Sequence, residues 1–94
     1  IGDFQVRQIR LNLKSSLVPA LSIIKIDDTS GITNPLELNG VSEGDIILKI
    51  NDLPATWANL TTALKLTFPG DEILLELYGK DANKEVLVKT IASN

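Results

Sequence analysis

The stretch from Asn34 to Ala55, NPLELNGVSEGDIILKINDLPA, decides the fold that we predict for this chain. Its first half reads as a short helix, because proline suits the first helical position and the asparagine before it can cap free amides. Gly40 stands where a left-handed residue ends such a helix. We therefore expect a helix over residues 35–39.

The second half of the stretch predicts a buried strand between two tight turns. The turns are Glu43-Gly44-Asp45 and Asn51-Asp52, and the strand runs from Ile46 to Ile50. Four of these five strand residues are apolar. Near-continuous apolarity over so few residues suits a strand that is covered on both faces.

Upstream of this stretch the sequence predicts two more strands. Residues 4–14 read as extended, but their apolar side chains change parity: Phe4 and Val6 fall on one face, and Ile9, Leu11 and Leu13 on the other. A parity switch within a strand requires an extra residue, so we expect a bulge or bend near residues 7–8. Residues 14–19 are expected to form a loop, and residues 21–26 the second strand.

Downstream, the sequence predicts a long helix followed by a hairpin. A brief extended piece over residues 53–55 leads to Thr56, which can cap a helix that runs from Trp57 to about Thr67. Pro69 disfavours helix at the residue before it and ends this helix. The hairpin is expected to consist of strands over residues 72–78 and 85–91, with a polar tip at residues 79–84.

This order resembles the PDZ domains of bacterial proteases. In these domains a capped helix of the pattern Ser-Pro-(four residues)-Gly-hydrophobic leads into a Gly-Asp turn and an apolar strand that ends in Asn-Gly. Asn34, Pro35, Gly40 and Val41 fall on the cap, proline, glycine and hydrophobic positions, and residues 44–51 look like the family's most recognisable strand. The departures are Asp52, which replaces the usual glycine, and Leu36 and Asn39, which replace small alanines. The resemblance covers nearly the whole chain, is strong over residues 34–77 and is faint before residue 20.

The resemblance implies an α+β fold that is PDZ-like. We expect five or six antiparallel strands in a partly open barrel or sandwich, with one short and one longer helix, in the circularly permuted strand order of the bacterial domains. Residues 1–94 fit a single domain. The chain starts at Ile1 and contains no methionine, which indicates a piece of a longer protein. The core is expected to be aliphatic and to include Ile46, Leu48, Ile50, Leu60, Ala63, Ile73, Leu75 and Val88.

The composition argues against several classes of function. The chain has no cysteine and no histidine, so it lacks a thiolate nucleophile, a soft metal site and the commonest general base. Its six serines have no histidine to activate them, which leaves a serine–lysine pairing as the open alternative, and we expect neither catalytic activity nor a cofactor. The net charge of −3 argues against nucleic acid as a partner, because phosphate binding needs a positive face.

Two other kinds of site are weighed and set aside. Asp27, Asp28 and Ser30 suggest calcium, but an EF-hand loop needs ligands at alternate positions and a closing glutamate, and this stretch supplies neither. A solvated loop is the favoured interpretation. A small β-barrel that binds single-stranded nucleic acid is disfavoured by the acidity of the chain and by its aromatic share of 4%.

The resemblance places a peptide-binding groove between the first strand and the long helix, where a peptide joins the sheet as an added strand. It implies roles for Gly2 in the loop that receives the peptide's terminal carboxylate, for Phe4, Val6 and Arg7 on the groove strand, and for Trp57, Thr61 and Leu64 on the helix. Asp3 does not fit the loop, since an aspartate beside a carboxylate costs on the order of 1 kcal/mol near a surface. Arg7 and Arg10 are open to two interpretations: they offset the charge of Asp3, or they are edge-strand charges that block aggregation. Trp57 is open to a second interpretation as the core's one large anchor.

These observations predict a non-catalytic peptide-binding or regulatory module of a larger bacterial protease or processing protein. The expected partners are extended or C-terminal peptide segments and the catalytic domain of the parent chain, with no nucleic acid and no direct membrane insertion. The resemblance implies a location in the cell envelope or periplasm, outside the cytoplasm. The alternative is a structural PDZ-like module that packs against its parent chain and binds no free peptide.

Overall fold

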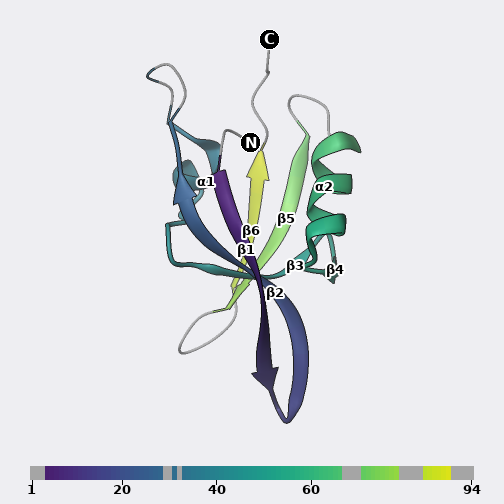
Figure 1. The fold of residues 1–94 in the computed structure, drawn as a ribbon. Coiled ribbons are helices and arrows are strands. Elements are labelled where there is room, and N and C mark those ends of the chain that lie inside the picture. The colour runs from purple at the N-terminus through teal and green to yellow at the C-terminus, as the bar shows by residue number, and fades with distance from the viewer. Residues whose placement is uncertain (1–3, 29–30, 32, 67–70, 79–83, 90–94) are drawn as a thin grey trace.

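The computed structural model describes residues 4–28, 31, 33–66, 71–78 and 84–89. Their elements are β1 (Phe4–Leu13), β2 (Ser16–Ile26), α1 (Pro35–Leu38), β3 (Ile46–Ile50), β4 (Leu53–Pro54), α2 (Trp57–Leu66), β5 (Glu72–Tyr78) and β6 (Lys84–Lys89) (Figure 1). The predicted order of strands and helices is therefore confirmed within the described residues.

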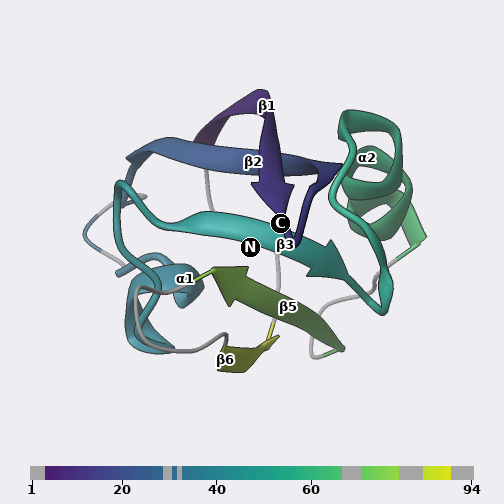
Figure 2. The same cartoon turned by 90° about the horizontal axis from the view of Figure 1, so that it is seen from below.

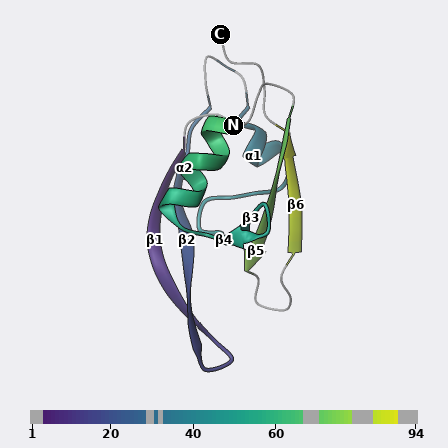
Figure 3. The ribbon, with the colours of Figure 1, turned by 90° about the vertical axis from the view of Figure 1, so that its right-hand side faces the viewer.

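The strands form one antiparallel sheet in the order β1-β2-β3-β5-β6, and the two-residue β4 pairs with β3. The sheet is not closed, because β1 and β6 are the two ends of this path in the described part of the chain. Figure 3 shows that the sheet bends, so that the β1–β2 pair and the β5–β6 pair lie on opposite sides of the molecule. Seen from below, α1 and α2 lie at opposite flanks of the sheet (Figure 2). The fold is thus a small α+β domain.

Local capping explains why α1 is short. The Asn34 side chain accepts a hydrogen bond from the Leu36 amide at 3.0 Å, and Pro35 follows it as the first helical residue. Gly40 has φ of 84°. Its amide donates to Glu37 O, and the Val41 amide donates to Leu36 O. This is the Schellman pattern, and the apolar contact that accompanies it is met because Leu36 and Val41 share the core.

The Glu43-Gly44-Asp45 turn attaches the start of β3 to β2. Gly44, with φ of 93°, donates its amide to Ile23 O at 2.8 Å, and the Ile23 amide donates to Asp45 O at 2.9 Å. The Glu43 carboxylate also accepts a hydrogen bond from the Ile26 amide at 2.9 Å. Within the strands, Leu21 of β2 pairs with Ile47 of β3, and Ser22 pairs with Ile46. The turn therefore extends the pairing of β2 with β3.

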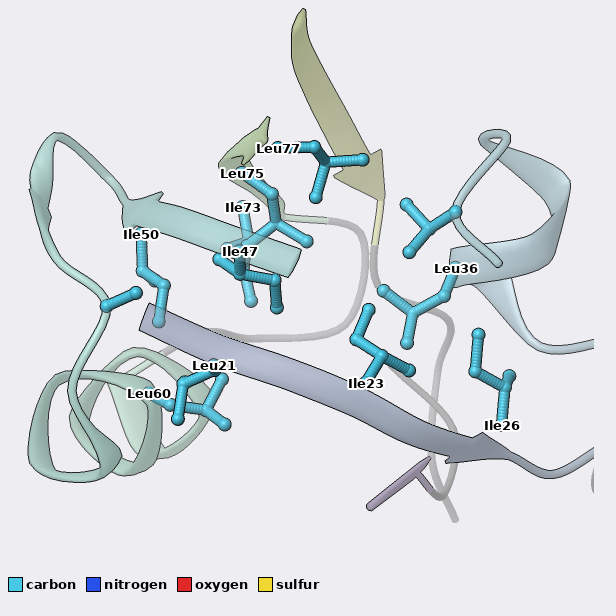
Figure 4. Close-up of a cluster of buried hydrophobic side chains, with 12 residues drawn as sticks. Leu21, Ile23, Ile26, Leu36, Ile47, Ile50, Leu60, Ile73, Leu75 and Leu77 are labelled. Atoms are coloured by element: carbon cyan, nitrogen blue, oxygen red, sulfur yellow. The ribbon is translucent and has the colours of Figure 1, made fainter. Parts of the chain in front are cut away.

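The core lies between the two sides of the bent sheet (Figure 4). It contains Leu21, Ile23, Ile26, Leu36, Val41, Ile47, Ile50, Ala55, Leu60, Ile73, Leu75 and Leu77. Ile50, Leu60, Ile73 and Leu75 are confirmed as core residues, Leu48 is also buried, and Ala63 packs against the cluster from outside. Ile46 is only partly buried, which corrects its assignment to the core, and the side chain of Val88 lies outside the described part of the chain.

Two predictions for the N-terminal region were wrong. Residues 14–19 form no loop: β2 begins at Ser16, and Lys14 and Ser15 alone make the turn, both with positive φ. Pro19 pairs with Arg10 of β1, and β3 meets β2 only at Leu21 and Ser22. A proline is tolerated there because this end of β2 has a strand partner on one side within the described residues.

The bulge near residues 7–8 is also absent. The register shifts between Gln5 and Val6, and the extra residue is Ile24 on the partner strand. This shift lets both Ile23 and Ile26 reach the core. From Val6 to Leu13 the pairing of β1 with β2 is uninterrupted, so Ile9, Leu11 and Leu13 lie on the face opposite to that of Phe4 and Val6.

Candidate functional site: a groove between β1 and α2

An apolar groove separates β1 from α2. Its volume is about 270 Å³, and it is lined by Phe4, Val6, Trp57, Leu60, Thr61, Leu64 and Lys65. Phe4 and Val6 form its strand side, and they also pack against the core. The other five residues form its helix side. Figure 3 shows α2 lying beside β1 along the upper part of the strand.

The helix side follows from the spacing of α2. Residues three and four apart share one face of a helix, so Trp57, Thr61 and Leu64 form a continuous row. Thr56 starts the helix as predicted, since its side-chain oxygen accepts a hydrogen bond from the Asn59 amide at 3.1 Å. The Thr61 hydroxyl donates to Trp57 O at 2.9 Å. Its hydrogen is therefore used within the helix, and its methyl group is the part of Thr61 that can offer apolar contact.

Trp57 is 59% exposed, which rules out its interpretation as the large anchor of the core. The indole instead lines the groove at the start of α2. Leu64, two turns later, is 38% exposed. Large apolar side chains that are both exposed and gathered in a concave surface are typical of binding sites.

Helix α2 runs antiparallel to β1. The Trp57 amide donates to Oε1 of Gln8 at 2.9 Å, so α2 starts beside Gln8. Lys65 and Leu64 line the groove together with Phe4, so the helix ends toward the start of β1 (Figure 1). The groove thus has a Trp57 end and a Lys65 end, and Lys65 is the charged residue among those that line it.

β1 offers a free edge beside this groove. In the described part of the chain it pairs with β2 alone, so its other edge presents backbone amides and carbonyls without a strand partner. Such an edge can pair with an extended chain. Arg7 and Arg10 are exposed on this strand, which fits both interpretations that the sequence left open for them.

Five of the predicted site residues meet in the groove: Phe4, Val6, Trp57, Thr61 and Leu64. Arg7 does not, because it follows Val6 in the strand, where side chains alternate, and it lies opposite Ser22. Gly2 and Asp3, and with them the proposed carboxylate loop, lie outside the described residues.

Sequence reasoning missed three residues of this region. Leu60 was assigned to the core alone, but it also lines the groove. Lys65 lies four residues after Thr61, and this helical spacing was a signal that could have identified it. Gln8 lies two residues after Val6 and therefore on the same face of β1, but nothing local indicates that its partners are Ala20, Ala55 and Trp57.

The aspartates near α1 have structural partners. Asp28 accepts a hydrogen bond from the Asn34 amide at 3.1 Å, and Asp27 O accepts one from the Asn34 side chain at 3.0 Å. Asp27 also pairs with Lys25 at 3.5 Å. Within the described residues, no group of three or more acidic side chains is arranged to hold a metal ion, and no helix has the length and apolarity needed to span a membrane.

No protein-family model matches this chain, and neither does any curated protein. Among solved structures, the fold is similar to part of an aminopeptidase N family protein from Idiomarina loihiensis, with a TM-score of 0.60 and 19% sequence identity. The match covers 94% of this chain and 14% of that protein. The chain therefore has the fold of a domain that occupies a small part of a much longer peptidase-family chain.

Proposed function

We propose that this chain is a non-catalytic, PDZ-like module of a larger peptidase, and that it binds an extended peptide as an added strand between β1 and α2. The observation that carries the proposal is the apolar groove beside the edge of β1 that pairs with no strand in the described part of the chain. The edge supplies main-chain hydrogen bonds, and the row formed by Trp57, Thr61 and Leu64 supplies side-chain selectivity.

Two further facts support the proposal. The similar solved structure belongs to a peptidase-family protein and is matched over a small part of its length. The chain has neither histidine nor cysteine, so a nucleophile within it would depend on another activating group. The module's role is therefore to bind a segment of substrate, or of its own parent protein, beside a catalytic domain elsewhere.

The fluorescence of Trp57 tests this proposal directly. The chain contains one tryptophan, so any change on titration is assigned to the groove. Hydrophobic C-terminal peptides should bind with affinity in the micromolar range, about −8 kcal/mol at 1 μM, because one added strand buries little area. Amide shifts of residues 4–11 should move during the same titration.

A pair of leucine variants provides the matched control. Leu64→Asp places a charge in the groove and should weaken binding at least roughly tenfold. Leu38→Asp changes a leucine of α1 that is 69% exposed and far from the groove, and should leave binding unchanged. Equal effects of the two variants would contradict the groove as the binding site.

The structural module remains the second candidate, and the small share of the peptidase-family chain that is matched favours it. In a parent protein of that size, another segment can occupy the groove permanently. This alternative predicts that a broad peptide library leaves both Trp57 fluorescence and the amide shifts of residues 4–11 unchanged. It also predicts that the groove residues are protected from solvent in the full-length parent.

A further inference from the structure

Gln8 makes a network of hydrogen bonds that joins three parts of the fold. Its Nε2 donates to Ala20 O of β2 at 2.8 Å and to Ala55 O, just after β4, at 3.1 Å. Its Oε1 accepts from the Trp57 amide at 2.9 Å. One side chain thus ties β1 both to the interior of the sheet and to the first residue of α2.

The bond to Trp57 adds to the local cap of α2. The first amides of a helix have no partner within the helix, and Thr56 satisfies one of them, that of Asn59. The Trp57 amide is satisfied by Gln8, which is 49 residues away in the sequence. Oε1 also places a partial negative charge at the positive end of the helix. The start of α2 is therefore held against β1 by a contact between elements.

The position of Gln8 links this contact to the groove. Gln8 lies on the face of β1 that carries Phe4 and Val6, one pleat beyond Val6. Gln8 is not among the residues that line the groove, so it acts on the groove through Trp57. Because α2 starts at this contact, the distance between Trp57 and β1 depends on it.

We propose that Gln8 is a positioning residue that sets the width of the groove at its Trp57 end, and with it the groove's affinity for an extended ligand. The part that concerns affinity rests on the proposed function. The part that concerns geometry does not, because the position of α2 can be measured in the free protein.

Two variants separate the halves of the network. Gln8→Met has a similar length but makes no comparable hydrogen bonds, so it frees the Trp57 amide. Gln8→Glu keeps an acceptor for the Trp57 amide and removes both donors to the carbonyls of Ala20 and Ala55. Gln5→Met and Gln5→Glu are the matched controls, since Gln5 is exposed on the same strand and lies outside the groove lining.

Hydrogen exchange and nuclear Overhauser effects test the geometry. In Gln8→Met the exchange of the Trp57 amide should accelerate roughly tenfold or more, as expected for the loss of one hydrogen bond. The cross-peaks between Val6 and Thr61 methyl groups should weaken. In Gln8→Glu the Trp57 amide should stay protected. The Gln5 variants should match the wild type in both measurements.

Peptide titration tests the functional consequence. Measured on folded protein, Gln8→Met should bind the hydrophobic peptide roughly tenfold more weakly than the wild type. Gln8→Glu should lose less of this affinity. A purely structural role would lower the melting temperature but leave this affinity unchanged. If wild-type protein binds no peptide, the proposed function fails. If exchange and cross-peaks match the wild type in Gln8→Met, the role of Gln8 is rejected, whatever the peptide does.

Discussion

The segment from Asn34 to Ala55 and the β1–β2 hairpin are held in place by different kinds of contact. In the first, the contacts that form α1 join residues a few positions apart: Asn34 caps Leu36, and Gly40 and Val41 close the same helix. In the hairpin, the polar contacts that fix its position come from distant parts of the chain, from Trp57 to Gln8 and from Ile26 to Glu43. Local contacts form whenever the segment folds, whereas distant ones require the whole domain.

The two-residue turns of the two regions reverse this pattern. Lys14-Ser15 and Asn51-Asp52 both have positive φ at both positions without a glycine. The Asn51 side chain accepts from the Leu74 amide at 2.9 Å, and its own amide donates to Leu74 O at 2.8 Å. That turn is therefore fastened to β5. The Lys14-Ser15 turn lies at the projecting tip of the hairpin (Figure 1).

The largest effect is expected from Leu36→Ala in the locally capped segment. Leu36 is 1% exposed and packs with Val41 at the end of α1. Removing its side chain should lower the free energy of unfolding by about 2–5 kcal/mol. Urea denaturation measures this free energy. Leu38→Ala, on the same helix but 69% exposed, should change the free energy of unfolding by less than about 0.5 kcal/mol. Comparable losses in the two variants would contradict the assigned packing.

The next effect is expected from the cap itself. Asn34→Ala removes the acceptor for the Leu36 amide and the donor to Asp27 O from a residue that is 2% exposed. The free energy of unfolding should fall by about 1–2 kcal/mol, measured in the same way. Asn12→Ala in the hairpin, where the asparagine is exposed, is the comparison and should be nearly neutral. A neutral Asn34→Ala would show that local capping does not hold this segment.

The same distinction explains what the sequence predicted. The bounds of α1, β3, β5 and the start of α2 follow from caps, turns and periodicity that lie within a few residues. The start of β2 was mistaken for a loop because Pro19 and two serines resemble loop chemistry, and only its pairing with β1 makes a strand of it. The five groove residues were implied by the resemblance to bacterial PDZ domains, with helical spacing adding Thr61 and Leu64 to Trp57, while Gln8 was not found, because its partners are distant.

A smaller effect, of opposite sign, is expected from glycine in the two turns. Asp52→Gly and Ser15→Gly place at a positive φ the residue that adopts it without steric cost. Each should raise the free energy of unfolding by about 0.5–1 kcal/mol, less the entropy that glycine adds to the unfolded chain. The contacts of Asn51 with Leu74 are unaffected by Asp52→Gly, so similar gains are expected in both turns. A lower free energy of unfolding for either variant, measured by urea denaturation, would contradict the backbone strain that we assign to these positive φ angles.

The smallest effect concerns Glu37, on the exposed surface of α1. Desolvation, together with the like charges of Asp28 and Glu43, raises the pKa of this carboxyl above its usual value of 4.5. The folded state therefore binds the proton more tightly than the unfolded chain, so the contribution of Glu37 to stability falls as pH rises through the raised pKa and is recovered on acidification toward 4.5. Glu37→Gln removes the charge, so the variant should be slightly more stable than the wild type at neutral pH.

This advantage of Glu37→Gln should shrink as the pH falls and should also shrink in high salt, which screens exposed charges. Urea midpoints measured between neutral pH and pH of about 4 test this, with Glu72→Gln on β5 as the baseline for losing one exposed negative charge. An advantage that is the same for both variants would show that net charge, rather than the neighbourhood of Asp28 and Glu43, is responsible.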